Sequence, residues 1–167
     1  MMEYLAVQTS AGPFLLVAVA LAMAVPMTDG AAEPPGERSY IERPVVRGAP
    51  QLAVTDAVRT GNTLYIGGHL GIDPATGRAP PESAVEARLA MEALRRTVAA
   101  AGLQMDDLVA VTVFSTDVGL DQTFNEVYRS YFHGHYPAQT FVGADSLRRG
   151  ARFEVLGVAV KAPRMRL

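Results

Sequence analysis

The chain has 167 residues, 49% hydrophobic and 19% charged, a composition typical of one folded domain rather than of a disordered chain. It carries 15 basic and 17 acidic side chains, which excludes a strongly basic nucleic-acid-binding protein and an acidic tail protein. Cysteine is absent from the sequence, so disulfides, thiolate metal sites and a cysteine nucleophile are excluded as well.

The N-terminal segment differs from the rest of the chain in charge and hydropathy. Residues 1–32 contain no Lys or Arg, and residues 14–25 form an uninterrupted apolar run. Such a run is too short to span a bilayer with ease and is typical of a secretory signal, although a signal normally begins with basic residues and this segment has Glu3. We expect export to the periplasm or the exterior. The alternatives are an uncleaved membrane anchor and a wrongly assigned start codon, which would leave the protein in the cytoplasm.

A proline-rich linker is predicted over residues 33–44, because closely spaced prolines disfavour a helix and favour an extended chain. Part of this region, around residues 40–46, is expected to pair as an edge strand. The folded domain is then predicted over residues 45–167.

Five strands are predicted inside the domain. Gly61 and Asn62 separate two apolar, β-branched runs, a pattern that predicts a hairpin. Residues 108–116 are strongly β-branched and predict a strand inside the sheet. The strands are expected over residues 52–59, 63–70, 108–116, 139–142 and 152–160.

Two helices are predicted between these strands. Ser83 and Glu86 form a capping box, which predicts the start of a helix that Gly102 ends. Its buried face is expected to contain Ala87, Met91, Leu94, Val98 and Ala101. Asp121 is predicted to cap the second helix, whose apolar face carries Phe124, Val127, Tyr128 and Tyr131.

The order of these elements indicates an α+β fold with a mixed sheet and both helices on one face. The other face of the sheet has no helix to cover it. A small domain usually buries such an apolar face in an oligomer, and clefts between subunits are common ligand sites.

Most polar clusters favour a structural interpretation. His133 and His135 could form a metal pair, but no third ligand lies at useful spacing, so no metal site and no cofactor are expected. The basic cluster of Arg148, Arg149 and Arg152 is expected to be a solvated turn rather than an RNA surface.

Glu154 is the more informative residue, because it lies inside the apolar strand predicted over 152–160. Alternation places Phe153 and Val155 on one face of this strand and Glu154 and Leu156 on the other. A carboxylate on a potentially buried face is costly unless it is paired or lies in a wet cleft, and such groups are candidates for acid–base catalysis. The alternative, an edge glutamate that points to solvent, fits the pattern equally well.

Four segments of the chain, in order, resemble the RidA/YjgF family of imine and enamine deaminases. They read AVRTGNTLYIGGHLGIDPATG (57–77), AAGLQMDDLVAVTVFSTDVGLDQTFNEVYRSYF (100–132), YPAQTFVG (136–143) and RGARFEVLGVAV (149–160). The resemblance implies a chorismate-mutase-like fold and a homotrimer, in which the sheets form a central barrel with clefts between subunits.

The resemblance also implies roles for individual residues. The family's catalytic glutamate, thought to position the water that hydrolyses a C=N bond, falls on Glu154. The family's cleft asparagine and the tyrosine that follows it fall on Asn125 and Tyr128. The arginine that binds the substrate carboxylate is replaced by Gln139, and loss of such a charge-assisted contact costs roughly 1.5–3 kcal/mol, or about one to two decades in rate.

Two further positions depart from the family pattern. The Ser-Gly-Gln stretch of the second strand reads Gly67-Gly68-His69 here, so Gly67 and His69 are expected at the substrate site. His69 could act as an acid or base or pair with Glu154, although a structural role at the end of a strand is favoured. A cleft tyrosine of the first strand is replaced by Val54.

The sequence therefore predicts a hydrolytic deaminase of small imine or enamine compounds, with a substrate range altered by Gln139. The alternatives are a non-catalytic small-molecule-binding trimer of the same fold and a structural or interaction role outside the cytoplasm. The expected partners are a small-molecule ligand and further copies of the chain, with a membrane contacted only through an uncleaved N-terminal segment. An endoribonuclease activity has also been attached to this family, but the neutral charge of the chain does not favour a nucleic-acid partner.

Overall fold

The computed structural model describes residues 37–42 and 53–161, so the signal-like segment 1–32 and part of the predicted linker lie outside the described residues. The described residues belong to one unit that spans residues 33–167. They contain six strands: β1 (Arg38–Ile41), β2 (Ala57–Thr60), β3 (Thr63–Leu70), β4 (Leu108–Ser115), β5 (Ala138–Gly143) and β6 (Phe153–Val160).

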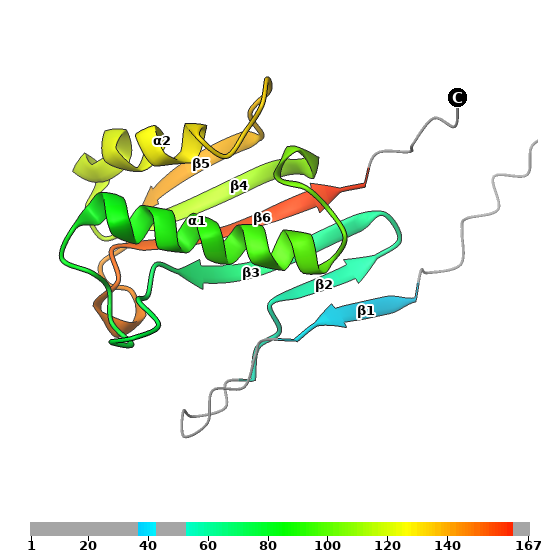
Figure 1. Cartoon of the computed structure of the whole chain (residues 1–167), viewed down its shortest axis with the longest axis horizontal. Helices are drawn as coiled ribbons and strands as arrows, with labels where there is room; N and C mark the ends of the chain where they lie inside the picture. The colour runs from blue at the N-terminus through cyan, green and yellow to red at the C-terminus, as the bar shows by residue number, and fades with distance from the viewer. Residues whose placement is uncertain (1–36, 43–52, 162–167) are drawn as a thin grey trace, which may run out of the picture. The chain divides into compact units, whose positions relative to one another are not determined.

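These strands form one mixed sheet in the order β1-β2-β3-β6-β4-β5 (Figure 1). The β4–β5 pair is parallel, and every other pair of neighbours is antiparallel. The predicted hairpin is confirmed by β2 and β3, which are joined through Gly61 at a φ of +55°, a conformation that glycine adopts at little cost. The first strand of this hairpin begins at Ala57, later than the predicted position 52, and β1 lies inside the region predicted as a linker.

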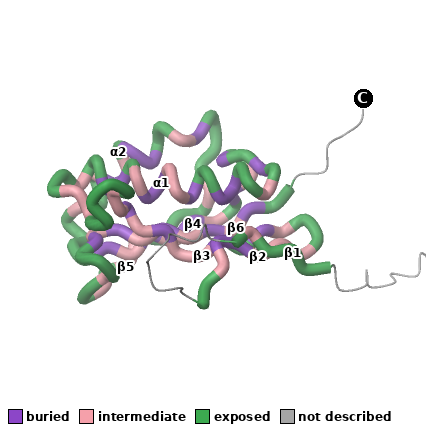
Figure 2. Tube along the Cα trace, turned by 60° about the horizontal axis from the view of Figure 1, so that its bottom comes forward, coloured by how far each residue is buried: buried purple, intermediate pink, exposed green. Residues whose placement is uncertain are grey.

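Two helices, α1 (Ser83–Ala100) and α2 (Asp121–Arg129), cover one face of the sheet (Figure 2). α1 packs on β3, on β6 and on α2. Met91 and Leu94 of its predicted apolar face are fully buried, and the predicted α+β class is confirmed. Among the described residues, no helix is both long and apolar enough to cross a membrane.

The predicted N-terminal caps of both helices are wrong, whereas Gly102 ends α1 as predicted, with a φ of +70°. Glu82 precedes α1 as its N-cap residue without a side-chain cap, and Glu86 is fully buried and binds the start of β6 instead of the helix terminus. Asp121 is the first residue of α2, and its carboxylate accepts a hydrogen bond from Asn125. The short 3₁₀ turn Val118–Leu120 just before α2 is capped instead by the side chain of Asp117, which accepts from the backbone N–H of Gly119 at 2.8 Å.

The hydrophobic core lies between the sheet and the helices. Phe124 of α2 is its aromatic centre, with ring contacts to Tyr128, Phe141 and Phe153. The opposite face of the sheet carries half-buried or exposed apolar side chains and is covered by no element of the described part of the chain. By strand register these include Tyr40, Val58, Tyr65, Leu156 and Val158.

Candidate functional site

Glu154 lies on the uncovered face of the sheet, near the start of β6. Its neighbours Phe153 and Val155 are fully buried toward the helices, whereas Glu154 is half-buried on the other side. The strands on either side place Leu70 of β3 and Phe114 of β4 directly opposite it. A carboxylate therefore stands among apolar side chains, where an unpaired charge is costly and a polar ligand or water is favourable.

Gly68 determines where the Glu154 carboxyl group lies. A Cβ atom at position 68 would be 2.0 Å from Glu154 Oε1 and 2.7 Å from Cδ, so the carboxyl group lies directly over the glycine backbone. Gly67 and Gly68 together oppose the single residue Leu156, which makes a β-bulge in β3. We predicted Gly67 as a site residue and missed Gly68, although paired glycines inside a strand indicate a bulge or a close approach.

His69 lies on the other side of the sheet from Glu154. The bulge adds one residue to β3, so His69 pairs with the buried Val155 and faces the helices. Its Nε2 atom is 3.1 Å from the hydroxyl oxygen of Thr97 in α1. The structure therefore does not bring His69 together with Glu154, and an acid–base pair between these two side chains is not formed.

Asn125 and Tyr128 lie together on α2. The side-chain amide of Asn125 donates to the Asp121 carboxylate at 2.6 Å. Tyr128 is buried against the rings of Phe124, Phe132 and Tyr136, and this burial raises its pKa above the ordinary tyrosine range. The Tyr128 hydroxyl has no hydrogen-bond partner among the residues that the structure describes.

Gln139 is exposed on β5 and belongs to the same side of the molecule as α2. It is paired with Val111 of β4 and shares a face with Phe141, which contacts Phe124 of α2. Because β4 lies between β5 and β6, the backbones of Gln139 and Glu154 are separated by roughly 10 Å across the sheet and about 10 Å along it.

The predicted site residues therefore form two groups within one copy of the chain. Glu154 lies over the Gly67–Gly68 bulge on the uncovered face of the sheet. Asn125, Tyr128 and Gln139 belong to the α2–β5 side. Val54, which the sequence resemblance placed at a cleft tyrosine of the family, is 46% exposed and offers no polar group.

The two histidines of the loop before β5 lie apart from other clustered ligand side chains of the described residues. The ring Nδ1 of His133 is 3.7 Å from a carboxylate oxygen of Asp106, and His135 is exposed. Residues 37–42 and 53–161 contain no group of three His, Asp or Glu side chains that could hold a metal ion.

The expectation that Arg148, Arg149 and Arg152 form one solvated turn is wrong for Arg152. Its guanidinium Nε donates to the buried Glu86 carboxylate at 2.6 Å. Arg148 and Arg149 are exposed in the loop before β6, and Arg149 has a φ of +58°, which is unusual for a residue with a side chain.

The fold and the site define a class of α+β protein with a mixed sheet, two helices on one face and a half-buried carboxylate on the other. The family model described as Endoribonuclease L-PSP matches residues 48–161. A mouse relative named 2-iminobutanoate/2-iminopropanoate deaminase is 36% identical over 110 residues, which are 65% of this chain and 82% of that protein.

Solved structures give the same result. Escherichia coli TdcF with bound serine aligns with a TM-score of 0.66 and 31% identity, over 74% of this chain and 99% of that one. RidA from an Antarctic Psychrobacter aligns with a TM-score of 0.65 and 28% identity, over 74% of this chain and 99% of that one. The chain belongs to the RidA/YjgF family, whose family model carries the Endoribonuclease L-PSP description.

Proposed function

We propose that this protein is a hydrolytic deaminase of small imine or enamine compounds, in which Glu154 places the attacking water. The observation that carries this proposal is the Glu154 carboxyl group over Gly68, between the apolar residues Leu70 and Phe114 of the neighbouring strands. The mouse relative named 2-iminobutanoate/2-iminopropanoate deaminase supports the reaction class.

In the proposed reaction, the Glu154 carboxylate accepts a proton from a water molecule whose oxygen attacks the imine carbon. The electron pair of the C=N bond moves to nitrogen, which takes up the proton that Glu154 removed from the water. The C–N bond of the resulting carbinolamine then breaks as the C=O bond forms and the hydroxyl proton passes to nitrogen, so that one imine and one water give one carbonyl compound and one ammonia. An apolar surround favours this role, because few other groups compete for the carboxylate or the water.

We further propose that the site is a cleft between subunits of a homotrimer whose sheets pack into a central barrel. The uncovered face of the sheet supports the association, since Tyr40, Val58, Tyr65 and Val158 lie side by side across four neighbouring strands of it. The division of the predicted site residues into two groups supports the cleft. A three-carbon acid is too small to touch Glu154 and Gln139 of one copy, so a site that uses both would combine two copies.

The proposed substrate range differs from that of a family member with arginine at position 139. Gln139 can donate a neutral hydrogen bond to a carboxylate but cannot neutralise its charge. This substitution also favours the second candidate, a trimer of the same fold that binds a small molecule without turning it over.

The experiment that tests the proposal is keto-acid release from freshly generated 2-aminoacrylate by the purified protein. We expect ammonia and keto acid in equal amounts, and loss of this activity in Glu154→Ala. Turnover that survives in Glu154→Ala would contradict the proposal, whereas ligand binding without turnover in the starting protein would favour the second candidate.

The Gln139→Arg variant tests the altered substrate range. We expect this change to raise kcat/KM for 2-aminoacrylate by about 10- to 100-fold, because it restores a charge-assisted contact to the carboxylate. A matched change at another exposed glutamine, Gln122→Arg on α2, controls for added charge. An equal rise in both variants, or none in Gln139→Arg, would contradict the assignment.

A further inference from the structure

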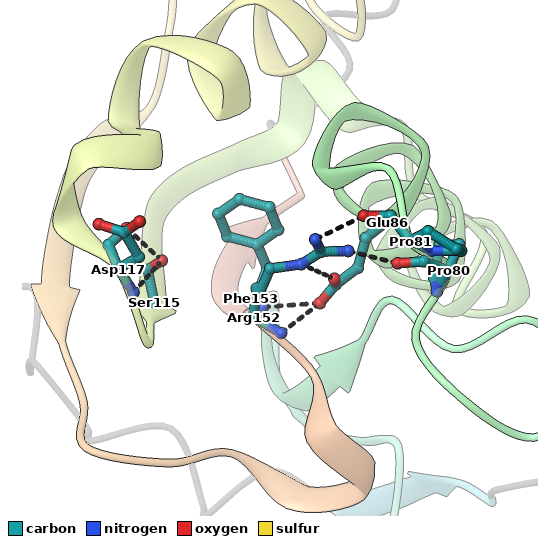
Figure 3. Close-up of polar contacts among 7 residues, drawn as sticks. All are labelled: Pro80, Pro81, Glu86, Ser115, Asp117, Arg152 and Phe153. Carbon is teal, nitrogen blue, oxygen red and sulfur yellow. Dashed lines mark hydrogen bonds and ion pairs between the residues drawn. The ribbon is translucent and has the colours of Figure 1, made fainter.

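A buried ionic cluster connects the start of α1 to the start of β6. Glu86, in the first turn of α1, is fully buried, and both of its carboxylate oxygens are used. Oε1 accepts the backbone N–H groups of Arg152 and of Phe153, the latter at 2.9 Å. Oε2 accepts from Arg152 Nε at 2.6 Å, and the same guanidinium donates to the carbonyl oxygens of Pro80 and Pro81 (Figure 3).

This cluster fixes how the chain enters β6. In a regular strand, successive backbone N–H groups point in opposite directions. Here the N–H groups of Arg152 and Phe153 converge on one oxygen of Glu86, so the chain bends at the residue before the strand. On the other side, the carbonyl of Arg152 accepts from the backbone N–H of Thr116 at 3.0 Å, and Phe153 is paired with Ser115. The next residue along the chain is Glu154.

Glu86 also contacts the end of β3, the strand that is paired with Glu154 through Leu70. A Cβ atom at Gly71 would be 2.2 Å from the Glu86 carbonyl oxygen and 2.6 Å from its Cγ, so the first turn of α1 lies directly against the end of β3. The residue before Gly71 is Leu70, which is paired with Glu154. One buried residue, Glu86, therefore contacts the ends of both strands: its carboxylate binds the start of β6, and its backbone and Cγ lie against the end of β3.

We propose that Glu86 is a positioning residue that, through Arg152 and the backbone of Phe153, holds the Glu154 carboxyl group over Gly68. This inference rests on the proposed function for its catalytic consequence, but its geometric part does not. Glu86 and Arg152 touch no ligand in this account and act only through the direction of β6. A displacement of the reacting carboxylate by about 1 Å is expected to lower turnover by about 10- to 100-fold.

The test uses two variants of the full-length protein, Glu86→Gln and Arg152→Lys. Glu86→Gln keeps an oxygen for the two backbone N–H groups and loses the charge, whereas Arg152→Lys keeps the charge and loses the planar contacts to Pro80 and Pro81. We expect kcat for 2-aminoacrylate to fall 10- to 100-fold with KM changed by less than threefold. Both variants are measured, so that a folding defect in one of them leaves the other to test the proposal. The matched control is Glu92→Gln, which breaks another glutamate–arginine pair on α1.

A second measurement is independent of activity. Selective ¹⁵N labelling of the 15 glycines gives an NMR signal for Gly68, which lies under the Glu154 carboxyl group. We expect Glu86→Gln and Arg152→Lys to shift the Gly68 signal in the same direction as Glu154→Gln does, and Glu92→Gln to leave it in place. An unmoved Gly68 signal in both folded variants would overturn the inference, whatever the activity. An inactive starting protein with a shifted Gly68 signal would instead refute the proposed function and keep the positioning role.

Discussion

At the scale of single residues, the position of the Glu154 carboxyl group depends on the absence of a side chain at position 68. The carboxyl oxygen occupies the space that a Cβ atom would take, at a distance of 2.0 Å from that atom's place. Neither the glutamate nor the fold alone creates this arrangement. It needs the Gly67–Gly68 bulge, which adds one residue to β3 opposite β6 and leaves a backbone without a side chain under the Glu154 carboxyl group.

A methyl group at this position is therefore expected to move the carboxylate without unfolding the protein. In Gly68→Ala, we expect turnover of 2-aminoacrylate to fall by about 10- to 100-fold while the circular dichroism spectrum is retained. Gly143→Ala is the matched control at the same end of the sheet, because its Cβ would meet only a Val118 methyl group, at 3.1 Å. Equal activity in the two variants would show that the position of Glu154 over Gly68 does not matter for the reaction.

At the scale of elements, the hydrophobic pattern was sufficient to predict both helices and the main strands, because 3.6-residue and two-residue periods report directly on burial. It could not predict the role of Glu86. Ser83 and Glu86 have the spacing of a capping box, but the arginine that pairs with Glu86 lies 66 residues away in the sequence. The sequence also could not predict the side of the sheet on which His69 lies. The alternation of side chains between the two faces of β3 reverses after the bulge, and the bulge is visible only in the pairing of β3 with β6.

The hydrogen bond between Glu92 of α1 and Tyr131, which follows α2, leads to a prediction about how stability depends on pH. Burial alone would raise the pKa of Glu92, but hydrogen bonds from Arg95 and Tyr131 lower this pKa below its ordinary value. Burial and the hydrogen bond to Glu92 raise the pKa of Tyr131 to about 12. A carboxylate whose pKa is lowered by folding stabilises the folded state above its unfolded pKa and loses that contribution as the pH falls through the folded pKa.

We therefore expect Glu92→Gln to lower the free energy of unfolding at pH 7 by less than about 1 kcal/mol, since the Glu92–Arg95 pair is partly exposed to solvent. The difference from the starting protein should close between about pH 5 and pH 3. Urea unfolding at a series of pH values measures it. Glu126→Gln serves as the control, because within residues 37–42 and 53–161 that carboxylate accepts only from the amide of Gln122. A difference that does not change with pH would refute this account of Glu92.

At the scale of the whole molecule, the proposed cleft needs more than one copy of the chain. Val158 lies on the uncovered face of the sheet, paired with Tyr65 of β3 and Ala110 of β4. An aspartate at this position would place a charge inside the proposed barrel, where it has no partner. In Val158→Asp we expect sedimentation of a monomer and loss of turnover. Val85→Asp, on the exposed side of α1, is expected to leave the assembly intact. A stable trimer in Val158→Asp would contradict the proposed association.

The central claim is that the carboxylate of Glu154, held over Gly68, activates the water that hydrolyses the imine. The most direct measurement is the turnover of 2-aminoacrylate by Glu154→Gln, compared with its binding of a non-hydrolysable carboxylic acid of similar size. Glutamine has nearly the same shape but cannot accept the proton of the water. We expect turnover to fall by at least about 100-fold, in line with the contribution of a positioned general base, while ligand affinity and assembly are retained. Unchanged turnover in Glu154→Gln would contradict it.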